Sequence, residues 1–180
     1  MRTKSIALLT ALSFLLALAV MVGCSQNRAN QPSVKENVEH QLDNANLKDV
    51  KVDEDRDKGV LTLKGDVKSD EQKAQAEDIA KAAAGNMVVA NEISVRPEGM
   101  EGDARKIENN VDDGIDNNLK AAFTAAKLDN QHINVDVKNG VVTLKGDVDT
   151  AAQRSQAEKI AAKVPNVTQV VNELEVKGKK

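Results

Sequence analysis

Few side chains in this chain have the chemistry of a catalytic or metal-binding site. The 180 residues contain two histidines, His40 and His132, and one cysteine, Cys24. Neither histidine has a second histidine or a cysteine at the spacing of a transition-metal site, so we expect both at the surface. The sequence also lacks a glycine-rich phosphate loop, a Gly-x-Ser-x-Gly motif and a converging Ser/His/Asp set. We predict that the protein is not an enzyme and needs no cofactor or metal.

Two acidic clusters are the remaining candidates, the first for calcium binding and the second for catalysis by paired acids. The run from Asp53 to Asp57 has the oxygen density of a calcium loop, but it lacks the glycine and the closing glutamate that such loops require. The pair Asp112-Asp113 falls on the polar side of a predicted helix. Solvated carboxylates are the ordinary case in both settings, and we interpret both clusters as surface.

The single cysteine follows a segment typical of exported proteins. Arg2 and Lys4 precede an uncharged, mostly apolar run over residues 6–23. Met21-Val-Gly-Cys24 resembles a bacterial lipobox, in which a small residue precedes a cysteine that receives a diacylglycerol. We predict a lipoprotein signal peptide over residues 1–23 and lipid attachment at Cys24. The apolar run is also just long enough to cross a thin hydrocarbon core, so an uncleaved membrane anchor is the alternative.

The residues after the cysteine predict how the protein is held at the envelope. Residues 24–33 are polar and aperiodic, as in a flexible tether. Ser25, in place of aspartate, favours sorting to the periplasmic face of the outer membrane if the source has one. With one cysteine the chain has no intramolecular disulfide, so its domains must be stabilised by packing alone.

The rest of the chain is a duplication. Gly59-Val-Leu-Thr-Leu-Lys-Gly-Asp-Val67 recurs as Gly140-Val-Val-Thr-Leu-Lys-Gly-Asp-Val148, and the match continues without a gap to Val95 and Val176. Agreement over this length indicates two copies of one structural unit. We predict domains at residues 34–95 and 104–177, joined by a linker over residues 96–103.

Each copy has the same order of hydrophobic periods. A helical stripe opens the copy, running from Val34 to Leu42 in the first and from Ile107 to Phe123 in the second. Two alternating strands, a second helix and a last strand follow. A chain of this order forms a small mixed sheet with both helices on one face. The sequence therefore predicts an α+β fold, with two tandem α-β-β-α-β domains of three strands each.

Turn and cap signals support these elements. Asn139-Gly140 is typical of a two-residue type I′ hairpin turn. The second helix of each copy begins with a capping-box pattern, Ser69-x-x-Gln72 and Thr150-x-x-Gln153.

The second strand of each copy carries a glycine and a polar face. Gly65 and Gly146 indicate close approach of another backbone, which we assign to the helix that follows. We expect the sheet face opposite the helices to be open and solvated, with exposed side chains at Thr62, Lys64, Thr143 and Lys145.

The duplicated motif, followed by a Gln-x-x-Gln-Ala-Glu-x-Ile-Ala helix and a Val-Val-Asn-Glu-Leu-x-Val strand, resembles the BON domain. This family is named for bacterial osmotically inducible and nodulation proteins. The resemblance covers both copies and implies a non-enzymatic envelope protein. BON domains are proposed to bind phospholipid membranes, often anionic ones, and tandem BON proteins serve in osmotic protection and outer-membrane integrity.

Charge assigns the expected membrane contact to the second copy. The chain carries a net charge of −3, which is not that of a nucleic-acid-binding protein. Residues 34–95 contain 9 basic and 14 acidic residues, whereas residues 104–180 contain 12 and 11. Lysines near an anionic surface favour binding. The candidate membrane contacts are Lys120, Phe123, Lys127, Lys177, Lys179 and Lys180.

Two of these assignments have a simpler structural alternative. Phe123 continues the apolar stripe of its helix and aligns with Leu42, so a core position is its alternative. The terminal lysines are alternatively only solubilising. A competing function is a protein-interaction or stress-protection module that recruits other envelope proteins through its open sheet faces and edges, by strand addition.

Overall fold

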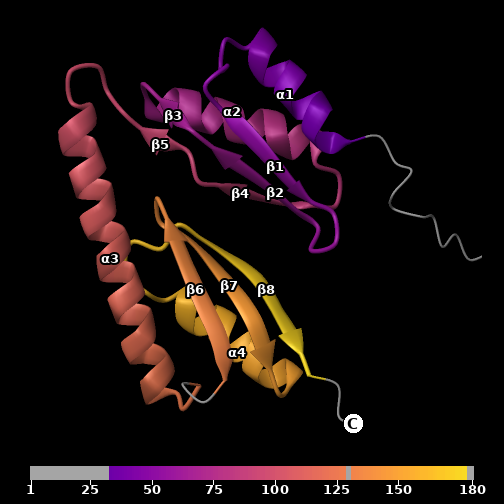
Figure 1. Cartoon of the computed structure of the whole chain (residues 1–180), viewed down its shortest axis with the longest axis vertical. Coiled ribbons are helices and arrows are strands. Elements are labelled where there is room, and N and C mark those ends of the chain that lie inside the picture. Colours follow the sequence, from indigo (N-terminus) through magenta and orange to yellow (C-terminus); the bar gives the residue numbers. More distant parts are fainter. Residues whose placement is uncertain (1–32, 129–130, 178–180) are drawn as a thin grey trace, which may run out of the picture. The chain divides into compact units, whose positions relative to one another are not determined.

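The computed structural model describes residues 33–128 and 131–177 (Figure 1). The predicted signal peptide, the lipid attachment site Cys24 and nearly all of the predicted tether lie outside the described residues. Lys179 and Lys180 also lie outside them. Within the described residues, no helix is long and apolar enough to cross a membrane.

The first copy forms two helices and a mixed sheet. Its elements are α1 (Val34–Asn44), β1 (Lys51–Asp55), β2 (Val60–Lys64), β3 (Asp66–Val67), α2 (Asp70–Ala83), β4 (Val88–Asn91) and β5 (Ser94–Val95). Strand β2 pairs antiparallel with β1 and parallel with β4, and the short β3 pairs parallel with β5. The predicted second and last strands are thus each interrupted once, and the predicted order of elements is confirmed.

The second copy repeats this topology with uninterrupted strands. Its elements are α3 (Glu101–Ala125), β6 (His132–Lys138), β7 (Val141–Val148), α4 (Ala151–Ala161) and β8 (Gln169–Val176). The sheet order is β6-β7-β8. Helix α3 begins at Glu101, inside the predicted linker, because the Met100 N–H bonds to the Pro97 carbonyl and the Glu101 carboxylate accepts from the Gly99 N–H. The connection between the copies is therefore shorter than predicted.

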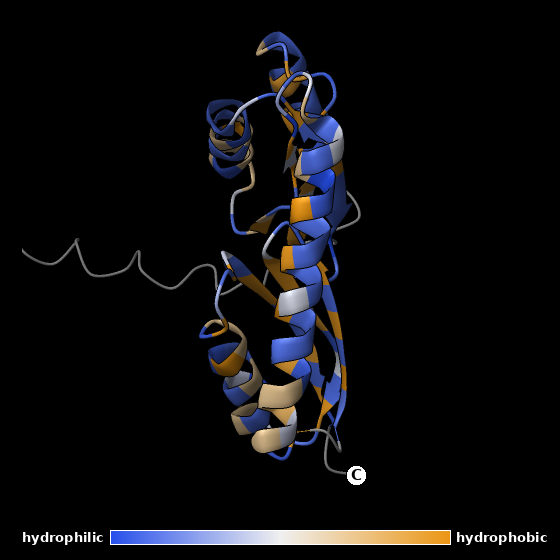
Figure 2. Cartoon of the chain, turned by 90° about the vertical axis from the view of Figure 1, so that its left-hand side faces the viewer, coloured by the Kyte–Doolittle hydropathy of each residue, from blue (hydrophilic) through white to orange (hydrophobic). Residues whose placement is uncertain are grey.

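Each copy has a core of its own between its helices and one face of its sheet. In the first, Val38 and Leu42 of α1 pack with Leu61 and Leu63 of β2. In the second, the stripe of α3 packs with alternate residues of β7, and the fully buried members of these two elements are Ile115, Leu119, Val142, Leu144 and Val148. Ile107, the predicted first residue of the stripe, is 63% exposed, because the core of the second domain does not reach the first turns of α3. The outward side of α3, which faces the viewer in Figure 2, is mostly hydrophilic. The predicted α+β architecture is confirmed.

The turn prediction is confirmed, and one of the two capping boxes is incomplete. Asn139 and Gly140 have φ values of 50° and 78°, as a type I′ turn requires. Helix α4 has a complete capping box at Thr150. At α2 the Ser69 hydroxyl accepts from the Gln72 N–H, but the Gln72 side chain accepts from the N–H of Lys68 instead.

The strand glycines approach a different backbone from the one predicted. A Cβ at Gly65 would lie 2.1 Å from the Asp49 carbonyl oxygen, and one at Gly146 would lie 2.0 Å from that of His132. Asp49 lies two residues before β1, and His132 is the first residue of β6. Neither carbonyl belongs to the helix that follows the glycine. Both glycines also have positive φ, at 124° and 109°. The prediction of a close approach was right, but its assignment to the helix was wrong.

The sheet faces opposite the helices are only partly open. Val60 and Ala90 of the first copy pack with Val141 and Val171 of the second in a small cluster of buried residues. Thr143 is buried as well, at 5% exposure, so the prediction of a solvated face was wrong at this end. Lys64 and Lys145 are exposed as predicted. Sequence periodicity did not reveal this contact, because it forms between faces that are each a mixture of polar and apolar residues.

The small cluster relates equivalent residues of the two copies. In the alignment of the duplication, Val60 corresponds to Val141 and Ala90 to Val171. The same faces of the two duplicated sheets therefore contact each other. Strand β4 also has a polar contact with β8, because the Gln169 side chain donates to the Val89 carbonyl at 2.7 Å.

Candidate functional site: one end of the second domain and the groove between α3 and β6

The topology brings three of the candidate membrane-contact lysines to one end of the second domain. His132 at the start of β6 pairs with Asp147, which pairs with Glu175 near the end of β8. Lys177 follows β8, and its Nζ lies 3.1 Å from the His132 Nδ1. Helix α3 ends at the same end of the domain, so Lys120 and Lys127 lie on its last turns or just beyond them (Figure 1). All three lysines are exposed.

Lys120 is held by a neighbour on its own helix. Its Nζ lies 2.5 Å from an Asp116 carboxylate oxygen, in an i,i+4 pair, although its side chain is 68% exposed. The charge is accessible to solvent but partly compensated. An exposed ion pair of this kind contributes little free energy.

Phe123 is a core residue. It is 6% exposed and belongs to the core of the second domain with Leu119 and Leu128. Its assignment as a membrane contact is corrected by this burial, because the ring cannot reach a membrane surface without leaving the core. The alternative that followed from its alignment with Leu42 is the arrangement found.

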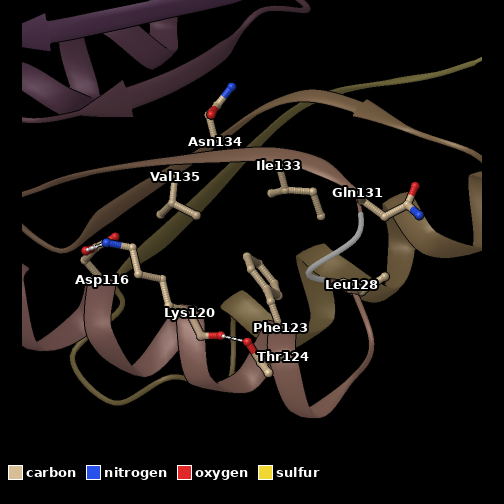
Figure 3. A pocket seen from close by; sticks show the side chains of 9 residues that line it. All are labelled: Asp116, Lys120, Phe123, Thr124, Leu128, Gln131, Ile133, Asn134 and Val135. Carbon is tan, nitrogen blue, oxygen red and sulfur yellow. Dashed lines mark hydrogen bonds and ion pairs between the residues drawn. The ribbon is translucent and has the colours of Figure 1, made fainter.

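Phe123 also lines an apolar pocket between α3 and β6. The pocket has a volume of about 360 Å³. Ile133 and Val135 project from β6 toward the Phe123 ring, while Asp116 and Lys120 lie along the helix at one side (Figure 3). The other residues that line it are Thr124, Leu128, Gln131 and Asn134. Its walls are mainly apolar, and its rim carries polar groups.

A second, acidic pocket continues the first along the same strand. It has a volume of about 430 Å³ and is lined by Asn109, Asp112, Asp113, Asp116, Lys120, Val135, Val137 and Lys138. Asp116, Lys120 and Val135 line both pockets. The two pockets therefore form one groove between α3 and β6, which we call the α3/β6 groove.

Asp112 links α3 to the hairpin turn at one end of this groove. One carboxylate oxygen accepts from the Asn139 N–H at 2.9 Å and the other from the Gly140 N–H at 3.0 Å. The carboxylate thereby satisfies the two backbone donors of the hairpin turn and ties β6 to α3. Sequence reasoning placed Asp112 on a solvated helix face and missed this role.

The acidic run of the first copy is also structural. The Glu54 carboxylate accepts from the Ser33 hydroxyl and the Lys35 N–H at the start of α1. The Asp55 carboxylate accepts from the N–H groups of Asp57 and Lys58 in the loop after β1. These bonds account for carboxylates that resembled a calcium loop. Among the described residues, no group of three or more His, Cys, Asp or Glu side chains could hold a metal ion.

Two connections between the copies were missing from the sequence analysis. The Arg96 guanidinium, 8% exposed, lies 3.0 Å from Asp66 in the first domain and 2.9 Å from Glu108 of α3. It therefore orients the start of α3. The Asn139 side chain donates to the Glu92 carbonyl at 2.6 Å and to the Ser94 hydroxyl at 3.0 Å. Asn139 was recognised only as a turn residue.

One carboxyl between the copies has a shifted pKa. Burial raises the pKa of Glu92 above its ordinary value of 4.5, and repulsion by Asp136 of β6 adds to the effect. The nearby lysines Lys64, Lys138 and Lys145 oppose the shift. The Glu92 carboxylate is thus incompletely compensated where the domains meet.

The two copies each match the BON domain family, over residues 30–97 and 111–178. The chain belongs to the BON-domain family. The duplicated Asn-Glu motif of these BON domains has a structural role. Asn91 donates to the Lys73 carbonyl and to the Glu77 carboxylate, and Asn172 donates to the Arg154 carbonyl and to the Glu158 carboxylate. In each BON domain this side chain links the last strand to the second helix.

Individual proteins are similar to this tandem BON chain. Osmotically-inducible protein Y of Escherichia coli (strain K12) is 33% identical over 137 residues, which are 76% of this chain and 67% of that protein. Among solved structures, the C-terminal domain of CdsD, the structural protein of the type III secretion system of Chlamydia trachomatis, aligns with a TM-score of 0.33 and 14% identity. That alignment covers 81% of this chain and 66% of that one.

Proposed function

We propose that this tandem BON protein is a non-enzymatic envelope lipoprotein whose second domain binds anionic phospholipid headgroups. Cys24 carries the lipid, residues 24–33 act as the tether, and the protein acts in envelope integrity or osmotic stress protection. The location that this implies is the periplasmic face of the outer membrane in a Gram-negative source.

Family membership supports the general part of this proposal. BON domains are associated with phospholipid membranes, and the similar E. coli protein is named for its osmotic induction. The family is in general non-enzymatic. The motif residues of this chain are consistent with a structural rather than a catalytic role. The repeated glycines allow two backbone segments to approach closely, and the repeated asparagines form hydrogen bonds between the last strand and the second helix.

The observation that carries the lipid-binding proposal is the gathering of lysines at one end of the second domain. Lys120, Lys127 and Lys177 come from the end of α3 and the end of β8, and Lys179 and Lys180 follow within three residues of Lys177. Each lysine near an anionic surface contributes about 1 kcal/mol to binding. Several weak contacts of this kind orient a protein that the acyl chains already hold at the membrane.

Sedimentation with lipid vesicles tests this proposal. Residues 25–180, which lack the lipid, should bind anionic phosphatidylglycerol vesicles but not neutral phosphatidylcholine vesicles, and high salt should weaken the binding because Coulomb attraction is screened. Replacing Lys120, Lys127 and Lys177 by alanine should reduce binding by about tenfold or more.

The matched control removes exposed lysines from the first domain. Lys48→Ala with Lys51→Ala should leave vesicle binding unchanged, because both residues are exposed lysines of the acidic first copy, outside the proposed surface of the second domain. Equal losses in the two variants would contradict the assignment to the second domain. Absence of binding to both vesicle types would leave the acyl group as the only membrane contact.

Lipid attachment has its own test. The full chain, expressed in a Gram-negative host, should fractionate with the outer membrane, and Cys24→Ser should move it to the soluble or inner-membrane fraction. Retention of Cys24→Ser in the outer membrane would contradict anchoring at this residue.

A further inference from the structure

We propose that the α3/β6 groove binds an extended peptide by strand addition to the edge of β6. The peptide places an apolar side chain in the apolar pocket and a basic side chain, two positions away, in the acidic pocket. This inference does not require the lipid binding proposed above, although Lys120 lines the groove and is also a proposed lipid contact. It assigns a protein partner of stated chemistry to one edge of the second domain.

Strand β6 has unpaired backbone groups on its outer edge. It is an edge strand, because the sheet order is β6-β7-β8. Lys138 and Val141 flank a two-residue hairpin turn, so they form a hydrogen-bonded pair. Along the two strands, hydrogen-bonded pairs alternate with pairs that are not hydrogen-bonded to each other. The N–H and C=O groups of Ile133, Val135 and Val137 therefore point away from β7. Among the described residues, none of these groups has a hydrogen-bond partner.

The two pockets lie along β6 at the spacing of an added strand. The apolar pocket is lined by Ile133 and Val135, and the acidic pocket by Val135 and Val137. The pocket centres are thus offset by two residues, which is about 7 Å along a strand. Side chains at alternate positions of an added strand point to the same face, so one peptide can fill both pockets.

The charges of the groove select a basic peptide side chain. The acidic pocket contains Asp112, Asp113 and Asp116 against Lys120 and Lys138. Asp113 is exposed, and no ion pair of the described residues involves it. An ammonium or guanidinium group complements this excess of negative charge, whereas a phosphate headgroup is repelled by it. The groove is therefore better suited to a peptide than to an anionic lipid.

The first domain does not offer the same groove. By sheet register, Val52 occupies the position of Val135, since Val52 pairs with Leu63 and Val135 with Leu144. Val52 is 1% exposed, whereas Val135 is partly exposed. In the first domain the start of α1 is tied to β1 through Glu54, which occupies the position of Val137. In the second domain the corresponding bonds run from Asp112 to the hairpin turn beyond the end of β6, so Val137 itself is not bonded to α3.

The direct test is titration of residues 25–180 with a short peptide that has the required alternation, acetyl-Ser-Thr-Thr-Leu-Thr-Lys-Thr-Thr-Ser-amide. We expect saturable binding followed by NMR. The N–H groups of Ile133, Val135 and Val137 should become protected from hydrogen exchange on binding. Those of Asn134 and Asp136, which already bond to β7, should change little. This alternation distinguishes strand addition from any other binding in the groove.

Variants of the groove give a second readout. Thr124→Phe fills the apolar pocket from an exposed position, and Asp113→Lys reverses the charge at the acidic pocket. Each should weaken peptide binding by about tenfold or more. Asp78→Lys, at an exposed position of α2, is the matched charge control and should bind like the parent chain. Circular dichroism checks that the variants remain folded.

Peptide controls decide the mode of binding. A peptide with glutamate in place of lysine should bind about tenfold more weakly, and one with alternate N-methylated amides should not bind, because it cannot pair with β6. Equal binding of the N-methylated peptide, or normal binding by Thr124→Phe, would overturn the proposal. Absence of saturable binding would overturn it too, as would concentration-dependent pairing of two copies through β6 that excludes the peptide.

Discussion

The Asn139 side chain of the second domain donates a hydrogen bond to the Ser94 hydroxyl of the first, with 3.0 Å between the two atoms. In the alignment of the duplication, Asn139 corresponds to Lys58 and Ser94 corresponds to Glu175. Lys58 and Glu175 form an ion pair. The hairpin loop of each domain thus contacts the last strand of the other. Two copies of one sequence contact each other through equivalent surfaces, as the subunits of a symmetric dimer do.

Asn139→Gly tests this contact. Glycine keeps the positive φ of the turn and the backbone bonds to Asp112, but it removes the bonds to Ser94 and to the Glu92 carbonyl. We expect the free energy of unfolding, measured by urea titration, to fall by about 1–2 kcal/mol. Lys58→Met, which removes the exposed equivalent pair, should change stability very little. An equal loss in both variants would contradict a special contribution of Asn139.

The glycines of the second strands should not tolerate a side chain. Gly65→Ala and Gly146→Ala place a Cβ about 2 Å from a backbone carbonyl oxygen, and we expect each to cost about 3 kcal/mol or more. Gly114→Ala is the matched control, because a Cβ there meets no atom within 4 Å in a helix interior. It should stabilise the protein by about 1 kcal/mol. Thermal unfolding of the three variants measures these effects.

The duplicated asparagines should differ in their contribution to stability. Asn91 is 4% exposed, and its side chain bonds to α2 and to the Ile93 N–H, so Asn91→Ala leaves buried polar groups without partners. We expect a loss of about 2–3 kcal/mol. Asn172 makes the same bonds nearer to solvent, and Asn172→Ala should cost about 1 kcal/mol. Chemical denaturation would contradict this ranking if the second loss were the larger.

Glu92 should make stability decrease with rising pH. Because its pKa is raised in the folded state, the folded protein binds the proton more tightly than the unfolded chain does. The free energy of unfolding therefore falls as the pH rises from about 4.5 through the raised pKa. Glu92→Gln should raise the melting temperature relative to the parent at pH 7, and the two should converge near pH 4.

Glu77→Gln provides a control of opposite sign. Hydrogen bonds from Lys81 and Asn91 lower the pKa of Glu77, so its ionised form stabilises the fold above pH 4.5 and this contribution is lost as the pH falls. The glutamine variant should melt below the parent at pH 7. If both variants shifted the melting temperature in the same direction, the shifts would not come from these ionisations.

The sequence by itself determined the duplicated α-β-β-α-β architecture and much of its detail. Hydrophobic periods predicted the stripe from Ile107 to Phe123, and its part from Ile115 to Phe123 is buried, because burial follows the repeat of each element. The start of the stripe was predicted wrongly, since Ile107 is 63% exposed. The turn at Asn139-Gly140 and the cap at Thr150 are local, so neighbouring residues suffice to specify them. Family resemblance then supplied the expectation of an envelope protein.

Only the tertiary structure decided what the surfaces do. The Asp112 carboxylate bonds to a turn 27 and 28 residues away, and Asn139 to a strand end 45 and 47 residues away, which no local pattern encodes. The α3/β6 groove depends on how closely a helix packs against an edge strand. That spacing distinguishes Val135 from its buried counterpart Val52, although both are valines in the same alternating pattern. Side-chain pattern determines which face is apolar, whereas the distances between elements determine whether that face is closed or open.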